Sequence, residues 1–471
     1  MSSRASLLLA GAALLGACTT ACTTIGPDYR EPAAQVDSKF AFGDGFDAGE
    51  PVAAFWQRFD DPVLDRIVTR ALAANHDLRI ADARLQEARG IRRDAEGERF
   101  PSLIANTGYT MQQFSTAEFP GPRSARNRDA FFARLEPFWE IDFFGRVRRS
   151  IEARVAELGA AEAGLYAAQV AVVGEVARSY FELRGAQRER TVAQSNAENQ
   201  RQTLTWTQAR LDAGRGTELD TARAAAQLES TLAILPLLEE RITRALLRLG
   251  VLIGARPNAL AGELNPAPSR ALPELGGIGT PEQLLRRRPD IRIAERQLAA
   301  STARVGVAVG DLFPRVIISG RLGFQSRGLL GLGSSDSVSY GLGPSIQWGA
   351  FDFTRVRARI ATAESRVEGQ LAAYEQTISR ALEETEGALV AYTLSRTRQG
   401  ALERAARASE QAVKLSRLRF EAGASDFLAV LDAERRLLAD QTALASSETS
   451  TATALVAVYK ALGGGWRPVT E

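Results

Sequence analysis

The chain has 471 residues, which is enough for a large buried core or for several domains. Its formal net charge of +2 does not favour nucleic acid or another polyanion as a partner. One histidine and two cysteines cannot supply a His/Cys metal cluster, and both cysteines lie near the N-terminus. No later apolar run is long enough for a transmembrane helix, so a membrane role would depend on β-strands or a covalent lipid.

Residues 1–17 have the pattern of a signal peptide, with a basic Arg4 followed by a stretch rich in leucine and alanine. The stretch ends in Leu15-Gly16-Ala17-Cys18, which resembles a bacterial lipobox and predicts acylation of Cys18. Cys22 is the less favoured acceptor, because Thr19 stands where a leucine is wanted. Ordinary signal peptidase cleavage remains the alternative.

Residues 18–60 are rich in proline, glycine and aspartate and predict an extended arm. Two helices should follow, from 61 to about 98, interrupted at Asn75. The second of them should begin at about Asp77, and we expect the sole histidine, His76, to cap that helix rather than to act in catalysis.

Two strands are predicted at about 102–113 and 130–142. One face of the second strand is apolar with an aromatic end, while the other face is charged. This alternation over roughly ten residues is typical of a membrane β-strand, but it also fits a half-buried hairpin in a soluble protein. Pro137 weakens the prediction for the interior of its strand, because proline cannot donate a ladder hydrogen bond.

A proline-free stretch from Gly145 to Ala213 predicts a helix on the order of 100 Å long. Gly214 would allow the chain to reverse, and Thr217 would cap a return helix running to about 253. Pro236 should kink that return helix.

The second half of the chain repeats the first. Residues 61–253 form one repeat, 254–280 a linker, 281–462 the second repeat and 463–471 a tail. Phe313-Pro314 matches Phe100-Pro101, and Gly423 lies 209 residues after Gly214 (423 − 214). Strands are predicted at about 315–326 and 339–352, the latter containing Pro344, and Ser425 and Asp426 are candidate caps after the second turn.

Four strands are too few to close a barrel, and open sheet edges are not tolerated in hydrocarbon. If these are membrane strands, several copies must therefore assemble. Three copies would provide twelve strands and a tunnel wide enough for a drug-sized molecule.

Four motifs resemble those of the TolC-like outer membrane factors, in particular the efflux lipoproteins of the OprM/NodT type. They are the segments 25–29 (IGPDY), 288–291 (RPDI), 419–432 (RFEAGASDFLAVLD) and 459–466 (YKALGGGW). The resemblance covers nearly the whole chain. It implies an α+β membrane protein: a homotrimer with a twelve-stranded outer-membrane β-barrel, four strands per chain, continued by a periplasmic barrel of long helical hairpins.

The resemblance also implies a function. The chain would be the outer-membrane channel of a tripartite efflux system, anchored by lipid, reaching into the periplasm and working with a periplasmic adaptor and an inner-membrane pump of the RND type. The exit duct of a type I protein secretion system is the alternative.

Site residues follow from the same resemblance. Leu428 and Asp432 match a leucine and an aspartate that constrict the channel, and Ala429 stands where TolC has a further aspartate. Arg223 occupies the place of Asp432 in the first hairpin and could pair with a neighbouring carboxylate to hold the pore shut. The tips at Gly214 and Gly423 would dock the adaptor.

Two other classes of protein fit the sequence less well. An enzyme would need a nucleophile elbow, a phosphate loop or a metal motif, and the sequence contains none of these. A periplasmic coiled-coil scaffold would explain the long helices but not the four alternating strands.

Overall fold

The structure is a computed structural model that describes residues 24–34, 36–47, 49, 52–118, 120, 122, 126–265, 271–349, 352–464 and 466. The chain forms two compact units. The sheet unit comprises residues 1–33, 84–161 and 293–375, and the hairpin unit comprises 34–83, 162–292 and 376–471.

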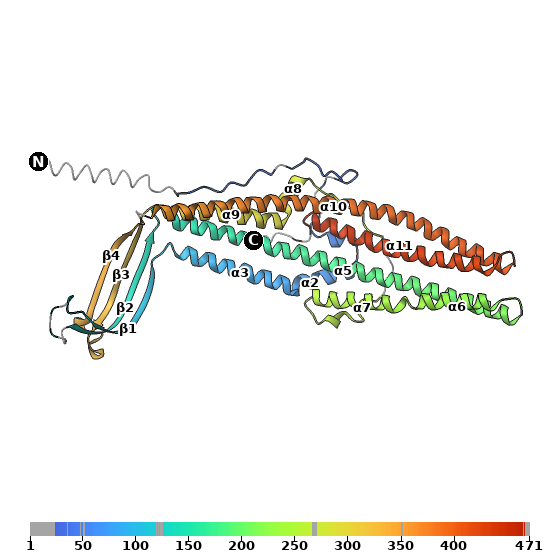
Figure 1. The fold of residues 1–471 in the computed structure, drawn as a ribbon, viewed down its shortest axis with the longest axis horizontal. Helices are drawn as coiled ribbons and strands as arrows, with labels where there is room; N and C mark the ends of the chain where they lie inside the picture. Colours follow the sequence, from blue (N-terminus) through green and yellow to red (C-terminus); the bar gives the residue numbers. More distant parts are fainter. Residues whose placement is uncertain are drawn as a thin grey trace. The chain divides into compact units, whose positions relative to one another are not determined.

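The sheet unit contains a four-stranded sheet in the order β1-β2-β3-β4, with every neighbouring pair antiparallel (Figure 1). Its strands are β1 (Ser102–Gln113), β2 (Asn127–Ile141), β3 (Arg315–Ser326) and β4 (Val338–Gln347). β4 ends five residues before the predicted limit at 352. The reason is that the carbonyl of Asp352 accepts the N–H of Val356 and so belongs to the start of the next helix, α10 (Phe353–Glu421).

Both prolines that weakened the strand predictions lie inside strands. On β2, the pairing with β3 includes Leu135 opposite Leu322 and Phe138 opposite Ser319, but it is interrupted at Pro137. The register is the same on both sides of this gap, so the missing N–H costs local bonds without shifting the strand. Pro344 lies on β4 and pairs with Ile318 of β3. β4 is an edge strand of the sheet.

Two tryptophans fasten the strands to the preceding chain in the same way. The indole N–H of Trp139 donates to the carbonyl of Arg99, just before Phe100-Pro101, at 3.0 Å. The indole N–H of Trp348 donates to the carbonyl of Leu312, just before Phe313-Pro314, also at 3.0 Å. The two Phe-Pro motifs therefore lie in the same kind of helix-to-strand corner in both halves of the chain.

In the hairpin unit, α2 (Pro62–Ala74) is capped by Asp61, whose carboxylate accepts the N–H groups of Val63 and Leu64. The next helix, α3 (His76–Gly97), is capped by Asn75. The Asn75 amide oxygen accepts the N–H groups of Asp77 and Leu78 at 2.8 and 3.2 Å. The prediction that His76 caps this helix was wrong: Asn75 holds the capping position, and His76 is the exposed first residue of the helix itself.

The long helix α5 (Arg146–Asp212) is followed by α6 (Glu218–Leu232) and α7 (Leu235–Leu252). A single kinked return helix was therefore the wrong expectation. Pro236 has no N–H for the carbonyl of Leu232, so α6 ends there, and Pro236 lies in the first turn of α7. The remaining helices are α8 (Pro281–Arg287), α9 (Pro289–Gly310) and α11 (Phe427–Ala461), with short 3₁₀ turns at Phe55–Phe59, Pro257–Leu260, Leu329–Gly331 and Ser335–Ser337.

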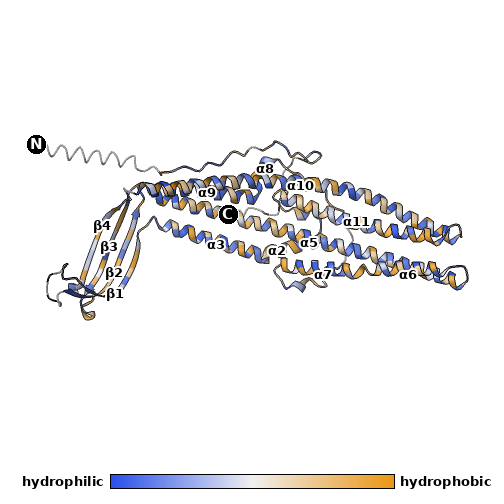
Figure 2. Cartoon of the chain, viewed as in Figure 1, coloured by the Kyte–Doolittle hydropathy of each residue, from blue (hydrophilic) through white to orange (hydrophobic). Residues whose placement is uncertain are grey.

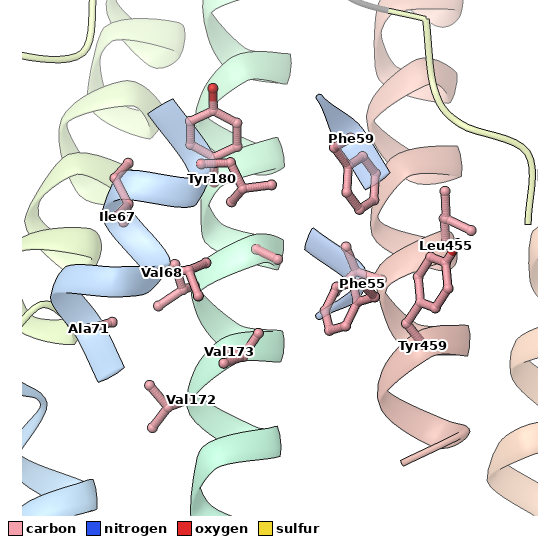
Figure 3. Packing of buried hydrophobic residues seen from close by; sticks show 14 of the residues in the cluster. Phe55, Phe59, Ile67, Val68, Ala71, Val172, Val173, Tyr180, Leu455 and Tyr459 are labelled. Atoms are coloured by element: carbon pink, nitrogen blue, oxygen red, sulfur yellow. The ribbon is translucent and has the colours of Figure 1, made fainter. Parts of the chain in front are cut away.

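A hydrophobic core of aliphatic and aromatic side chains holds the hairpin unit together (Figure 3). The ring of Phe55 stacks on that of Tyr459 with centroids 5.0 Å apart. The hydroxyl of Tyr180 donates to Asp61 at 2.5 Å, and burial, with this hydrogen bond, raises the pKa of Tyr180 to about 12. The cap of α2 is thereby tied to α5. None of the described helices combines the length and apolar character needed to span a membrane.

Candidate functional site

The two helical hairpins end in turns of the same geometry. Gly214 and Gly423 adopt φ values of +70° and +71°. Each glycine N–H bonds the carbonyl three residues back, at 2.9 and 3.0 Å, and the next N–H bonds the carbonyl five residues back at 2.8 Å. This is the glycine-dependent motif that closes the end of a helix. A Cβ at either glycine would meet no atom within 4 Å, so the backbone conformation alone calls for glycine.

The returning helices are capped by side chains. The hydroxyl of Thr217 accepts the N–H of Asp220 at 3.2 Å, and the carboxylate of Asp426 accepts the N–H of Ala429 at 3.2 Å. Of the two caps expected after Gly423, Asp426 fills the position. The hydroxyl of Ser425 is buried and finds no partner among the described residues.

Arginine–aromatic contacts bring the two hairpins together near their turns, where they lie side by side (Figure 1). The guanidinium of Arg210 lies over the ring of Phe420 at 4.4 Å, and that of Arg417 lies over Trp206 at 5.8 Å. A cavity of about 220 Å³, mostly apolar, lies among these side chains and Phe427. The two turns therefore form one local structure.

A buried polar cluster lies behind the second turn. The carboxylate of Glu434, only 5% exposed, accepts hydrogen bonds from Arg417 at 2.6 Å and from Thr203 at 2.8 Å. These three residues were not predicted from the sequence. Its one available signal was Glu434 between Leu431 and Leu437, a charged residue on an apolar helix face. Hydrophilic and hydrophobic residues are mixed along α5, α10 and α11, which carry these three residues (Figure 2).

The predicted constriction residues lie one helical turn apart on α11. Leu428 is 42% exposed and Asp432 is exposed as well. Within the described residues, Asp432 makes no ion pair, and neither does the half-buried Arg223 on α6. Both charges are thus available to groups outside the single chain. Cys18 and Cys22 lie outside the described residues.

Comparison with known proteins gives a consistent result. The family model described as outer membrane efflux protein matches residues 67–255 and 280–464. Outer membrane protein OprJ of Pseudomonas aeruginosa is 32% identical over 462 residues, covering 96% of this chain and 95% of that protein. The pyoverdine export outer membrane protein OpmQ of the same species is 32% identical over 468 residues, covering 98% and 96%.

Among solved structures, the outer-membrane channel OprN is 41% identical and superposes with a TM-score of 0.88. The superposition covers 95% of this chain and 100% of that one. The chain therefore belongs to the outer membrane efflux protein family: it has the TolC-like fold of four strands and long helices, and it is an outer-membrane efflux channel, not an enzyme.

Proposed function

We propose that three copies of this chain form a passive conduit that carries small molecules across the outer membrane. The observation that supports this most directly is the four-stranded sheet, in which β1 and β4 each have one strand neighbour among the described residues. Open edges are costly in hydrocarbon, so the strands of other copies would have to complete the sheet. Twelve strands from three chains would close it as a barrel.

Small molecules are the favoured cargo over secreted proteins. The relative OpmQ is named for the export of pyoverdine. The pump that delivers the cargo would be of the RND type, joined through a periplasmic adaptor that docks at the tips around Gly214 and Gly423. The exposed, unobstructed turns at both glycines suit such docking.

Leu428 and Asp432 would form the constriction of the conduit. Around a threefold axis, three leucines would disfavour water and three carboxylates would attract cations. Arg223 would pair with a carboxylate of a neighbouring copy and hold the hairpins closed. The exposure of Leu428 and Asp432, and the absence of a described partner for Arg223 within the chain, support these roles.

Acylation of Cys18, with Cys22 as the alternative acceptor, would anchor each chain in the outer membrane. The lipobox-like sequence at Leu15–Cys18 supports this assignment.

Single-channel recording in planar bilayers tests the constriction. In Asp432→Asn, the conductance should rise, and the divalent cation concentration that halves the current should rise by about tenfold, because three carboxylates no longer bind the cation. Leu428→Ser should raise the conductance without changing cation sensitivity.

Asp212→Asn is the matched control, because it removes a carboxylate near the first turn, where Asp212 accepts a hydrogen bond from Gln208 one turn earlier on the same helix. Its traces should match those of the unmodified channel. Unchanged conductance and cation block in Asp432→Asn would remove Asp432 from the constriction.

A further inference from the structure

Residues Ile25–Tyr29 of the N-terminal arm lie against α5 and α9 within the sheet unit. This segment is the IGPDY motif of the sequence. Neither the conduit nor its constriction explains why these residues are present.

Arg149 on α5 is the centre of the contact. Its side chain is only 3% exposed, and it donates to the carbonyls of Ile25 and Gly26 at 2.9 and 3.1 Å and to the carboxylate of Asp28 at 2.7 Å. Its other acceptor is Glu152, at 2.7 Å. Three of these four acceptors belong to the arm, so the arm both encloses the guanidinium and supplies most of its hydrogen bonds.

Two glycines make this approach possible. Gly26 has φ +87°, and a Cβ there would lie 2.4 Å from the Cα of Gly306 on α9. A Cβ on Gly306 would in turn lie 2.7 Å from Cγ of Arg149. The surface therefore excludes any side chain at position 26 and requires a glycine opposite it.

Tyr29 fills the next position. Its hydroxyl donates to Glu295 at 2.6 Å, its ring lies under the guanidinium of Arg296 at 5.8 Å, and it packs on a small apolar cluster. The cluster consists of Ala156, Ala299 and Ala300. An acidic side chain at 28 and a phenol at 29 thus meet groups of matching chemistry.

The same segment touches the corner where β2 turns into α5. The N–H of Ile25 donates to the carbonyl of Phe144 at 3.2 Å. The next residue, Gly145, has φ +83°, and a Cβ there would lie 2.9 Å from the Cα of Thr24. The arm thereby covers the backbone of this corner.

We propose that this surface of α5 and α9 is a peptide-binding site whose ligand is the chain's own Ile25–Tyr29, and that its occupation fixes the lipid attachment point to the β2–α5 corner. The second clause rests on the proposed acylation of Cys18. Ile25 lies seven Cα–Cα steps after Cys18 (25 − 18), so the anchor could lie at most about 25 Å from the site.

Hydrogen exchange with mass spectrometry on the purified full-length channel tests the site. Arg149→Gln should speed amide exchange at residues 24–31 by about tenfold or more, and exchange at 142–147 should rise with it, because the arm leaves the corner. Exchange in α11 should stay unchanged. Arg154→Gln is the control, since Arg154 bonds Glu157 on the same helix and not the arm.

Asp28→Asn and Tyr29→Phe change only the arm, so the body of the channel keeps its own contacts. Both should raise exchange at residues 24–31, while Asp37→Asn, an exposed aspartate further along the arm, should not. Slow exchange of residues 24–31 in Arg149→Gln and Asp28→Asn, or fast exchange in the unmodified channel, overturns the proposal.

Cys18→Ala separates the site from the lipid. Exchange at residues 24–31 should remain slow in this variant, because the docking contacts begin at Ile25. If the mature chain carries no acyl group on Cys18, the clause on the anchor fails and the peptide-binding site stands. Fast exchange in Cys18→Ala would show that the lipid, and not the site, holds the arm.

Discussion

Glu448 is a half-buried carboxyl in the hairpin unit. Its side chain lines a cavity of about 450 Å³ between α5, α10 and α11. Arg188 and Glu403 line the same cavity. Burial raises the pKa of Glu448, Glu403 raises it further, and Arg188 opposes the shift. The ionised form is therefore disfavoured in the folded state. Its destabilising effect is absent below the unfolded pKa of about 4.5 and grows as the pH rises through the raised folded pKa.

Glu448→Gln should consequently stabilise the channel at pH 7.5 and have no effect near pH 4. We expect an increase in Tm of about 1–2 °C at the higher pH, measured by thermal unfolding in the same detergent at both values. Glu421→Gln, an exposed carboxylate at the end of α10, is the control. An equal gain at both pH values would show that the ionisation of Glu448 is not the cause.

The buried carboxylate of Glu434 in the hairpin unit accepts hydrogen bonds from residues on other helices. Glu434 meets Thr203 across 231 residues of sequence and Arg417 across 17. Local pattern cannot reveal such partners, because a glutamate on an apolar face looks the same whether its partner is present or not. The family motif predicts a constriction role for Asp432, but no local pattern predicts the polar cluster around Glu434, two residues further along α11.

At the scale of the element, the helix turns show how a glycine can be required for different reasons. Gly423 has φ +71° with open space around it, whereas Gly254, at φ +68°, faces the carbonyl of Ala74 only 2.0 Å from a built Cβ. A side chain at position 423 would face only the backbone strain of a left-handed conformation. A side chain at position 254 would have the same strain and would also collide with the backbone carbonyl of Ala74.

Gly423→Ala should therefore cost about 1–2 kcal/mol in the free energy of unfolding. Gly254→Ala should cost clearly more, and Tm values of the two purified variants under one condition provide the comparison. Equal losses would mean that the tip at Gly423 is packed against something beyond the single chain, such as a neighbouring copy.

The strands were predictable as elements because alternation and flanking prolines are local signals. Their order in the sheet was not. β2 and β3 are neighbours although the helices α5 to α9 lie between them in sequence, and only the register of Trp139 with Ile318 and its neighbours shows this. The break between α6 and α7 was also missed as a break, because sequence alone does not distinguish a proline that bends a helix from one that ends it.

At the scale of the whole molecule, native mass spectrometry of the purified channel tests stoichiometry and anchoring together. The expected mass is that of three mature chains beginning at Cys18, each carrying two or three acyl chains. Unfolding the complex and measuring the single chain then locates the modification. A monomer would refute the trimer, and an unmodified N-terminus at another residue would refute the lipid at Cys18.

The sequence by itself determined the tandem repeat, the strands, the long helices and their glycine turns. These depend on periodicity and on backbone conformations that single residues prefer or forbid, and such information is local. The tertiary structure decided which polar groups pair, that Asn75 and not His76 caps α3, and that the segment from Ile25 to Tyr29 docks on Arg149. Those outcomes depend on packing between residues far apart in the chain, where the cost of an unpaired buried group selects one arrangement among many that the sequence pattern allows.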